Sequence, residues 1–474
     1  MPRNYTLENG KLYQERAEIP VFWSGDVIVA GGGPAGIGSA LSSARNGCST
    51  IIIEKHGYVG GMAAFGEGMP LGGAYPGYKK IGGIAEEILD SLRHAGPDSA
   101  SVRDVKYFSL WFFHDPEYLR YLAGELLQQA GVKIMLHAMV VDVIMEGNTL
   151  RGVIIESKSG RQAVLAKATI DCTGDADIVA WAGGPFFTGD EGQKTMAFTL
   201  PYVMADVDVP RAWQSLDQDP RLVKATARAL RDGLQLHADD KVWVLFNGIR
   251  PNTLYANNTR INGFDGSNTE EITLAELEAR KRIAVHIAFF RKYVPGFEQA
   301  YVSKVGDQIG IRDTRRIRGE ATLETADCIS FKKRGDSVIR AAGPLDDVSR
   351  KKGGEGTESS VRQMQNDKDW YEVPYGALVP QGLDNILVAG RMFSSSHLAQ
   401  AGTRGMGTMI GFGQVAGLAA SIVAKKGIKA REVDVGELRR MLVEQGCDLD
   451  GTRSAEDHGD EKMYISGVIY PEND

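Results

Sequence analysis

The stretch DVIVAGGGPAGIGSALSSARNGCSTIIIE, at residues 26–54, decides the fold. A β-branched run leads into three glycines, an Ala- and Ser-rich stretch follows, and a second β-branched run completes the unit. This order predicts a strand, a tight turn, a helix and a second strand. Units of this kind form parallel sheets with helices packed against them, so we expect an α/β fold.

Three glycines of this stretch, Gly31, Gly33 and Gly36, form a GxGxxG pattern between the predicted strand and the predicted helix. Gly31 permits a tight turn, Gly33 lets the backbone approach a pyrophosphate, and Gly36 allows close packing of the helix. The first helical turn, which contains Pro34 and Ala35, then meets the negative charge of the phosphates. A glycine-rich turn can have a purely steric origin, but this position between strand and helix favours a dinucleotide site.

Glu54 ends the second predicted strand, and Lys55 follows it. A carboxylate at this place can accept hydrogen bonds from both hydroxyls of a ribose, and it would repel a 2′-phosphate. We therefore expect Glu54 and Lys55 to lie beside an adenosine ribose that carries no such phosphate. These residues by themselves leave FAD and NAD open as the cofactor.

The composition excludes several other classes of protein. The chain has 474 residues, and its 54 Lys and Arg against 61 Asp and Glu give a formal net charge of -7, which disfavours nucleic-acid binding. Its four cysteines form no CxxC pair, so neither a zinc site nor a redox dithiol is predicted. The N-terminal residues contain no apolar signal region and the apolar runs are short, so we expect a cytoplasmic protein without a membrane span.

Several stretches, in order along the chain, resemble the FAD-dependent oxidoreductases of the glutathione-reductase-2 structural class. They are DVIVAGGGPAGIGSALSSARNG (26–47), EKHGYVGGMAA (54–64), KIGGIAEEIL (80–89), IDCTGDADIVAWAGGP (170–185), QIGIRDTRRIRGE (308–320) and NILVAGRMFSSSHLAQAGTRGMGTMIGFGQVAG (385–417). The resemblance implies that the cofactor is bound FAD. It also implies a Rossmann-type FAD-binding domain that is discontinuous in sequence.

The order of motifs predicts how the chain is divided. Helical and strand patterns alternate early in the chain, become rare in its middle, and return after Tyr371 with NILVAGR as a strand and a long small-residue helix behind it. We expect the FAD-binding domain at residues 1–184, with a cap segment at 66–112, and its returning part at 374–447. An inserted α+β substrate domain is expected at 185–373 and a peripheral C-terminal tail at 448–474.

Two features of the middle section are predicted from local signals. Thr273 and Glu276 form a capping box, so a helix is expected to start at Thr273 and to end at Pro295. The segment from Arg350 to Asp369 is rich in glycine and charge, and we expect a surface loop there.

The resemblance also carries cofactor contacts over to matching positions. Gly60, Gly61 and Met62 would form a turn beside the ribityl chain and the flavin, and the backbone of Val140 would contact adenine. Further contacts are expected from two strand ends and from the start of the last long helix, which would point at the pyrimidine side of the isoalloxazine and stabilise the reduced flavin. These residues are Thr173, Gly174, Asp175, Gly390, Arg391, Gly405, Met406 and Gly407.

Chemistry requires side chains beside the flavin, and the loop before the last long helix supplies His397 and Arg404. A histidine there could take a proton while hydride leaves for flavin N5, and Arg404 could bind a substrate carboxylate or the flavin itself. Arg316 and Arg318 would share one face of a strand and could clamp an anionic substrate. Salt bridges from these arginines to Asp313 and Glu320 would explain the run of arginines in this motif equally well.

The sequence therefore predicts an FAD-dependent oxidoreductase that transfers hydride between a small organic substrate and flavin N5. A flavin-dependent monooxygenase is the nearest alternative, and a non-redox FAD-bearing RNA-modification or scaffold protein and an NAD-binding regulator are more distant ones. No histidine, cysteine or carboxylate spacing predicts a metal site. Substrate, electron acceptor or donor, and homo-oligomerisation are left open.

Overall fold

The computed structural model describes residues 5–8, 11–14, 18–65, 69–96, 99–105, 109–190, 195–219, 222–237, 243–347, 368–455, 459–460 and 464–465. Of the surface loop expected from Arg350 to Asp369, all but the last two residues lie outside these ranges.

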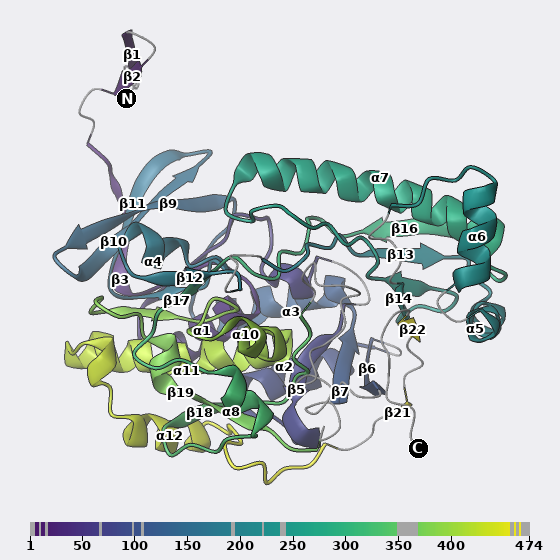
Figure 1. The fold of residues 1–474 in the computed structure, drawn as a ribbon. Helices are drawn as coiled ribbons and strands as arrows, with labels where there is room; N and C mark the ends of the chain where they lie inside the picture. The colour runs from purple at the N-terminus through teal and green to yellow at the C-terminus, as the bar shows by residue number, and fades with distance from the viewer. Residues whose placement is uncertain are drawn as a thin grey trace.

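A seven-stranded sheet organises the larger part of the molecule (Figure 1). Its parallel strands are β3 (Val21–Ala30), β4 (Thr50–Ile53), β8 (Lys133–Met135), β11 (Gly160–Asp171) and β20 (Ile386–Val388). The β-branched runs of β3 and β4 are fully buried at residues 27–30 and 50–53, as expected for parallel strands covered on both faces. The predicted α/β class is confirmed.

The antiparallel part of this sheet is a meander. It consists of β9 (Ala138–Glu146), β10 (Thr149–Ser157) and β11. β10 pairs with residues 160–165 of β11, whereas β20 pairs with residues 169–171. A strand from near the end of the chain thus completes a sheet that begins near its start.

Two helices form the centre of the larger core. α1 (Pro34–Arg45) and α11 (Met406–Lys426) pack side by side against the sheet, and both are built largely from small residues (Figure 1). Among the described helices, α11 is long and apolar enough to cross a bilayer, but 94% of its apolar window is buried inside the structure. Core packing therefore accounts for its composition.

Further helices and strands surround this core. α2 (Gly83–Arg93), α3 (Pro116–Gln129), α4 (Asp177–Trp181), α8 (Thr325–Ile329), α10 (His397–Thr403) and α12 (Val435–Glu444) are its helices. β5 (Leu71–Tyr75), β6 (Ala100–Val105) and β7 (Ser109–His114) form one small sheet with β21 (Gly459–Asp460), and β18 (Ser337–Ala341) pairs with β19 (Tyr371–Pro374). β12 (Phe186–Thr188) pairs with β17 (Arg315–Ile317). Asp115 caps α3 by accepting from the backbone N–H groups of Glu117 and Tyr118.

A second, separate core lies at the other end of the molecule (Figure 1). Its sheet has the order β16 (Tyr301–Val305), β13 (Tyr202–Ala205), β15 (Leu254–Ala256), β14 (Val244–Asn247) and β22 (Tyr464–Ile465). α7 (Thr269–Tyr293) runs along this sheet, and α5 (Val209–Gln218) and α6 (Val223–Arg231) close its far end. The rings of Trp243 and Phe289 stack on each other between α7 and the sheet, and the ring of Phe290 packs edge-on against both.

The helix start predicted at Thr273 is wrong. α7 begins one turn earlier, because the side chain of Asn268 accepts hydrogen bonds from the backbone N–H groups of Glu270 and Glu271. Thr273 lies inside the helix, where its hydroxyl donates to the carbonyl oxygen of Thr269. Glu276 instead accepts from the backbone N–H of Ile309 at 2.6 Å.

The structure divides the chain into more pieces than the expected domain boundaries do. Leu323, Val338 and Leu345 belong to the core of α1 and α11 and not to the core around α7. Two short pieces of the expected tail pair with other sheets, since β21 joins β6 and β22 joins β14. The boundaries themselves stay a prediction.

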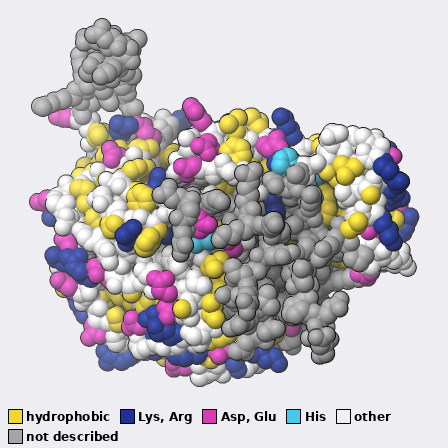
Figure 2. Space-filling model, viewed as in Figure 1, with side chains coloured by type: hydrophobic (Ala, Val, Ile, Leu, Met, Phe, Trp, Pro, Cys, Tyr) yellow, Lys and Arg dark blue, Asp and Glu magenta, His cyan; other side chains and the backbone are white. Residues whose placement is uncertain are grey.

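The face seen in Figure 2 carries side chains of both charges interspersed over most of its area. Lys and Arg side chains gather at the end of the molecule where α6 lies (Figures 1 and 2).

Candidate active site

The carboxyl ends of four parallel strands meet at one edge of the central sheet. β3 ends before Gly31, β4 before Glu54, β11 before Thr173 and β20 before Gly390. Gly31 has a φ of 105°, which a glycine adopts without strain, and its backbone N–H donates to Ile53 O at 2.8 Å. In open α/β sheets, ligands bind outside these strand ends.

The glycine turn after β3 forms a backbone cradle. A Cβ at Gly33 would meet nothing within 4 Å, so open space faces this residue at the start of α1. On its other side lies the predicted second turn, because Gly60 N donates to Gly32 O at 2.7 Å and a Cβ at Gly61 would lie 2.8 Å from Gly33 Cα. A Cβ at Gly36 would overlap Gly31 O, so this glycine is required for packing, as predicted.

Glu54 contacts both the glycine turn after β3 and the residues that follow β4. Its Oε2 accepts from Gly32 N at 2.6 Å, and its Oε1 accepts from the backbone and Nδ1 of His56 at 2.9 and 2.6 Å. Burial would raise the pKa of Glu54, but these hydrogen bonds lower it overall, so the carboxylate is charged. A carboxylate oxygen has room for more than one hydrogen bond, which leaves acceptor capacity for a ribose.

Lys55 and Val140 lie on either side of Glu54. Lys55 is exposed, and Val140 is buried in β9, two residues after Ala138, whose N–H donates to Glu54 O at 3.1 Å. The structure thus places both residues near the expected adenosine end.

The N-termini of α1 and α11 are staggered along one direction. Glycines of one helix fit against backbone of the other, with Gly413 at Ala35 O and Gly417 at Ser39 O, so the two helices run parallel. Gly38 in turn lies at Ile410 O and Gln414 N, so the start of α1 stands level with a position after Met406 in α11. One positive helix end therefore faces the phosphate cradle, and the other lies further out, where Gly405 caps it and Gly407 packs against Ala74.

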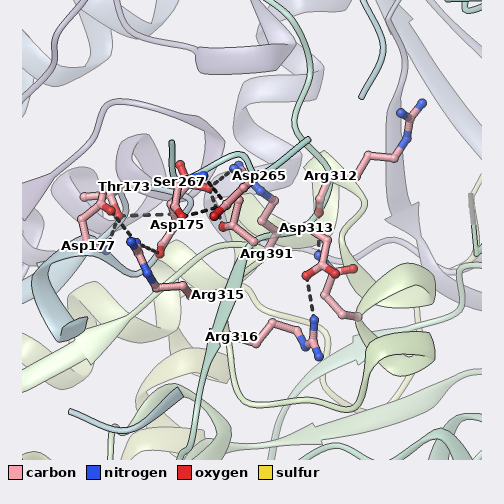
Figure 3. Close-up of polar contacts among 12 residues, drawn as sticks. Thr173, Asp175, Asp177, Asp265, Ser267, Arg312, Asp313, Arg315, Arg316 and Arg391 are labelled. Atoms are coloured by element: carbon pink, nitrogen blue, oxygen red, sulfur yellow. Dashed lines mark hydrogen bonds and ion pairs between the residues drawn. The ribbon is translucent and has the colours of Figure 1, made fainter. Parts of the chain in front are cut away.

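The turn after β11 connects the cradle to β20 (Figure 3). Asp171, whose pKa burial raises to about 6, accepts from the N–H and hydroxyl of Thr173 at 3.0 and 2.7 Å. Asp175 then accepts from Arg391 Nη2 and from the Thr314 hydroxyl, both at 2.6 Å. A Cβ at Gly174 would lie 2.5 Å from Arg391 Nη1, so the arginine lies directly over this turn.

The segment 307–316 runs past these cofactor-side turns. Gln308 Oε1 is 3.0 Å from His56 Nε2, and a Cβ at Gly310 would lie 3.1 Å from Met62 Cε. Further along, Thr314 reaches Asp175 as described above. One strip of the middle section therefore lines the whole edge from the adenosine end to β20.

His397 starts α10 between two carboxylates. Its Nδ1 is 3.1 Å from Asp313 Oδ2, and its Nε2 is 3.3 Å from Asp347 Oδ1. Burial would lower the pKa of His397, but the two carboxylates raise it to about 9. The imidazole is therefore charged at neutral pH, with no free lone pair to take a proton.

Arg404 and Arg312 lie near each other in the same region. Arg404 ends α10, and one turn before it Gln400 Nε2 donates to the carbonyl oxygen of Arg312 at 2.8 Å. The pKa of Arg312 is lowered to about 9, first by burial and then by the charges of Arg404 and Arg260. Two guanidinium groups thus share one partly enclosed region.

The side chains of Arg316 and Arg318 do not form one site. Arg316 is buried, with bonds of 2.7 Å to Asp313 Oδ1 and Gly189 O and of 3.1 Å to Ser395 O. Arg318 is exposed and lies over the ring of Phe187 at 4.5 Å. Arg312, in the same motif, was not among the predicted substrate contacts, although the crowding of arginines in IRDTRRIRGE pointed at this segment.

These features are those of a Rossmann-type dinucleotide-binding fold, in which a glycine turn, an acidic residue after the next strand and the start of a second helix lie along one edge of the sheet. The sequence model of the family described as FAD dependent oxidoreductase matches residues 26–442, and the chain belongs to this family. FAD as cofactor and enzymatic activity, both predicted from the sequence, are confirmed. The individual FAD contacts stay a prediction, and the open space at Gly33 and the capacity of Glu54 fit them.

Curated relatives match about a third of the chain. Thiamine thiazole synthase of Methanococcus vannielii is 33% identical over 166 residues, covering 33% of this chain and 58% of that protein. The same enzyme of Sulfolobus acidocaldarius is 32% identical over 172 residues, covering 34% of this chain and 60% of that protein. The chain therefore spans about three fifths of the length of these relatives.

Solved structures with a similar arrangement have low sequence identity. A geranylgeranyl bacteriochlorophyll reductase-like protein from Thermoplasma acidophilum has a TM-score of 0.47 at 15% identity, covering 90% of this chain and 84% of that one. The p-nitrophenol 4-monooxygenase of Pseudomonas putida has a TM-score of 0.45 at 13% identity, covering 89% and 86%.

Proposed function

We propose that this enzyme oxidises or reduces a small organic substrate between the outer end of α11 and the segment 307–316, with bound FAD exchanging hydride with it at flavin N5. The observation that carries this proposal is the convergence of Arg312, His397 and Arg404 at the start of α11. Arg312 comes from the segment 307–316, and His397 and Arg404 come from the two ends of α10.

The chain's own residues have distinct tasks in this proposal. The cradle at Gly33 and the carboxylate of Glu54 would hold the pyrophosphate and the ribose, and Arg391 would cover the turn at Gly174. The N-terminus of α11, at Met406 and Gly407, would place its partial positive charge where negative charge develops on the cofactor.

His397 acts here as a positioning residue and not as a general base. Because it is protonated, it fixes Asp313 and Asp347 on either side of α10 and thereby the position of Arg404. Arg404 would then contact the substrate or the pyrimidine edge of the flavin.

Anaerobic mixing of the yellow holoenzyme with metabolites of defined chemical classes tests this proposal, with loss of the oxidised-flavin absorbance as readout. We expect one class to bleach the flavin, and Arg404→Met to raise the half-saturating concentration at least about tenfold, the loss of one charged hydrogen bond. Bleaching by a nicotinamide dinucleotide alone, followed by oxygen incorporation into an added substrate, would instead identify a monooxygenase. A cytoplasmic location, the electron partner and homo-oligomerisation stay predictions from the sequence.

A further inference from the structure

We propose that Arg312 and Arg404 together bind the carboxylate group of the substrate, so that the substrate is a small organic acid. This inference rests on the proposed function, because it specifies the substrate class of the same site. It differs from the sequence-based expectation, which assigned an anionic substrate to Arg316 and Arg318.

Arg404 has a charge that the described protein does not neutralise. Its side chain makes no hydrogen bond and no ion pair with any residue within the described ranges, and its Nε is buried without a partner. Its position is fixed all the same, because its backbone N–H donates to Gln400 O at 3.0 Å and the next residue caps α11. A guanidinium with a buried, unpartnered N–H on a fixed backbone is expected where a ligand supplies that partner.

Arg312 is anchored, but only by neutral groups. Its Nη1 donates to Ala197 O and to the Thr199 hydroxyl, both at 2.6 Å, and its Nη2 donates to Asn257 Oδ1 at 3.4 Å. Figure 3 shows its side chain directed away from Arg315 and Arg316, whose charges are taken up by Asp177 and Asp313. Within the described residues Arg312 forms no ion pair, and Asp346 is the acid whose charge acts on it.

The nearby carboxylates cannot balance both arginines. Asp313 is engaged by Arg316 and His397, and Asp347 is engaged by His397. Asp346 is the remaining acid whose charge acts on both Arg312 and Arg404, and Arg260 adds a further positive charge. Burial lowers the pKa of both guanidinium groups, so their mutual repulsion is costly until an anion enters.

A carboxylate is the anion that suits this arrangement. Arg312 and Arg404, with Asp346 as the acid whose charge acts on both, leave an excess of positive charge that an anion would balance. Planar guanidinium groups bind planar carboxylates through paired N–H···O bonds. Gln400, one turn before Arg404, is fully buried and has an unpartnered Oε1, so an acceptor for a hydroxyl or amine of the same ligand lies beside the arginines.

The test measures binding and not turnover. The holoenzyme is titrated at constant ionic strength with acetate, with its neutral counterpart acetamide and with inorganic phosphate, and the shift of the flavin absorbance and the melting temperature are followed. We expect acetate to bind and acetamide not to bind. Arg404→Met and Arg312→Met should each raise the Kd for acetate about tenfold or more, whereas Arg211→Met, which removes an exposed arginine from α5, should leave it unchanged.

Arg312 also holds backbone of the second core, so FAD content and the visible spectrum are recorded for every variant. If Arg312→Met does not fold, Arg312→Lys keeps the charge but loses the paired geometry, and Arg404→Met carries the test by itself. Equal binding of acetate and acetamide, or unchanged acetate binding by the Arg404 variant, would overturn the inference. Tighter binding of phosphate than of acetate at these arginines would also overturn it, because the ligand would then be a phosphate ester.

Failure of this inference can be told apart from failure of the proposed function. If carboxylates bind through both arginines but no organic acid, alcohol or amine bleaches the flavin anaerobically, the proposed reaction is wrong and the carboxylate site stands. If a neutral metabolite bleaches the flavin while acetate does not bind, the reaction stands and the carboxylate site is wrong.

Discussion

Glu54 joins the glycine turn, the end of β4 and His56 before any nucleotide is present. Replacing it with Gln exchanges one carboxylate oxygen for an NH2 group, which would face either the N–H of Gly32 or the N–H groups of His56. We expect Glu54→Gln to weaken FAD binding about tenfold or more, since charged hydrogen bonds are lost. Titration of apoprotein with FAD, followed by quenching of flavin fluorescence, measures this. Glu87→Gln on the exposed pair with Arg45 is the control, and equal affinity of both variants would contradict the assignment.

His397 makes stability depend on pH in the alkaline range. Its folded-state pKa of about 9 exceeds the value of a free histidine, about 6.5, so its contribution is complete below the latter and is lost as pH rises through the former. The loss amounts to about 3 kcal/mol at most. Urea unfolding with saturating FAD at pH 6 and pH 9.5 should show it, and His397→Asn should reduce the difference. An identical pH dependence in the variant would rule out this assignment.

At the residue scale, the sequence predicted what local motifs define. The glycines of the cradle and Glu54 are recognisable because a strand, a turn and a helix surround them within one short stretch. Arg312 could not be selected over Arg316 in the same way, because the choice depends on distant residues. Arg316 is neutralised by Asp313 and by carbonyl groups of Gly189 and Ser395, whereas Arg312 finds only neutral hydrogen-bond partners, at Ala197 and Thr199 before β13 and at Asn257 after β15.

At the scale of elements, the close packing of α1 and α11 connects the two ends of the chain. A Cβ at Gly413 would overlap Ala35 O and lie 2.8 Å from Ser39 N, so Gly413→Ala must push the helices apart. We expect a loss of about 2–3 kcal/mol in unfolding free energy and weaker FAD retention. Gly124→Ala in α3 is the matched control, since its Cβ would meet nothing within 4 Å and helix propensity alone should stabilise it by up to about 1 kcal/mol. Thermal unfolding of both variants measures the contrast, and equal melting temperatures would contradict it.

Elements were predictable where their end signals were unambiguous. Asp115 with Pro116 marks the start of α3, and the small residues of α11 set it apart from the rest of the chain. The start of α7 was misplaced because two capping signals stand close together, Asn268 with Glu271 and Thr273 with Glu276. In the structure the helix begins at the first signal. Glu276 does not act in the second one, because its carboxylate accepts a hydrogen bond from the backbone N–H of Ile309.

At the scale of the whole molecule, two hydrophobic cores are joined along the segment 307–316. Asp307 contacts Tyr58 and Arg120, Gln308 contacts His56, and Thr314 contacts Asp175. Sequence patterns indicated a separate middle section, but not that its strip of polar residues lines the cofactor edge. Those contacts join residues far apart in the sequence, and no local pattern encodes them.

The last prediction concerns Arg316, the buried arginine of the segment 307–316. Arg316 binds Gly189 O, Asp313 and Ser395 O, so its guanidinium joins the entry to the middle section, the strip and the returning chain. Arg316→Met should cost about 3–5 kcal/mol in unfolding free energy, because Asp313 is left with His397 as its remaining cationic partner. Arg315→Met, which removes a half-buried pair with Asp177, should cost about 1 kcal/mol. Urea unfolding with flavin fluorescence as a second probe measures both, and we expect Arg316→Met to release FAD at lower urea than the wild type. A cost for Arg316→Met no larger than that for Arg315→Met would show that the strip does not depend on this buried charge.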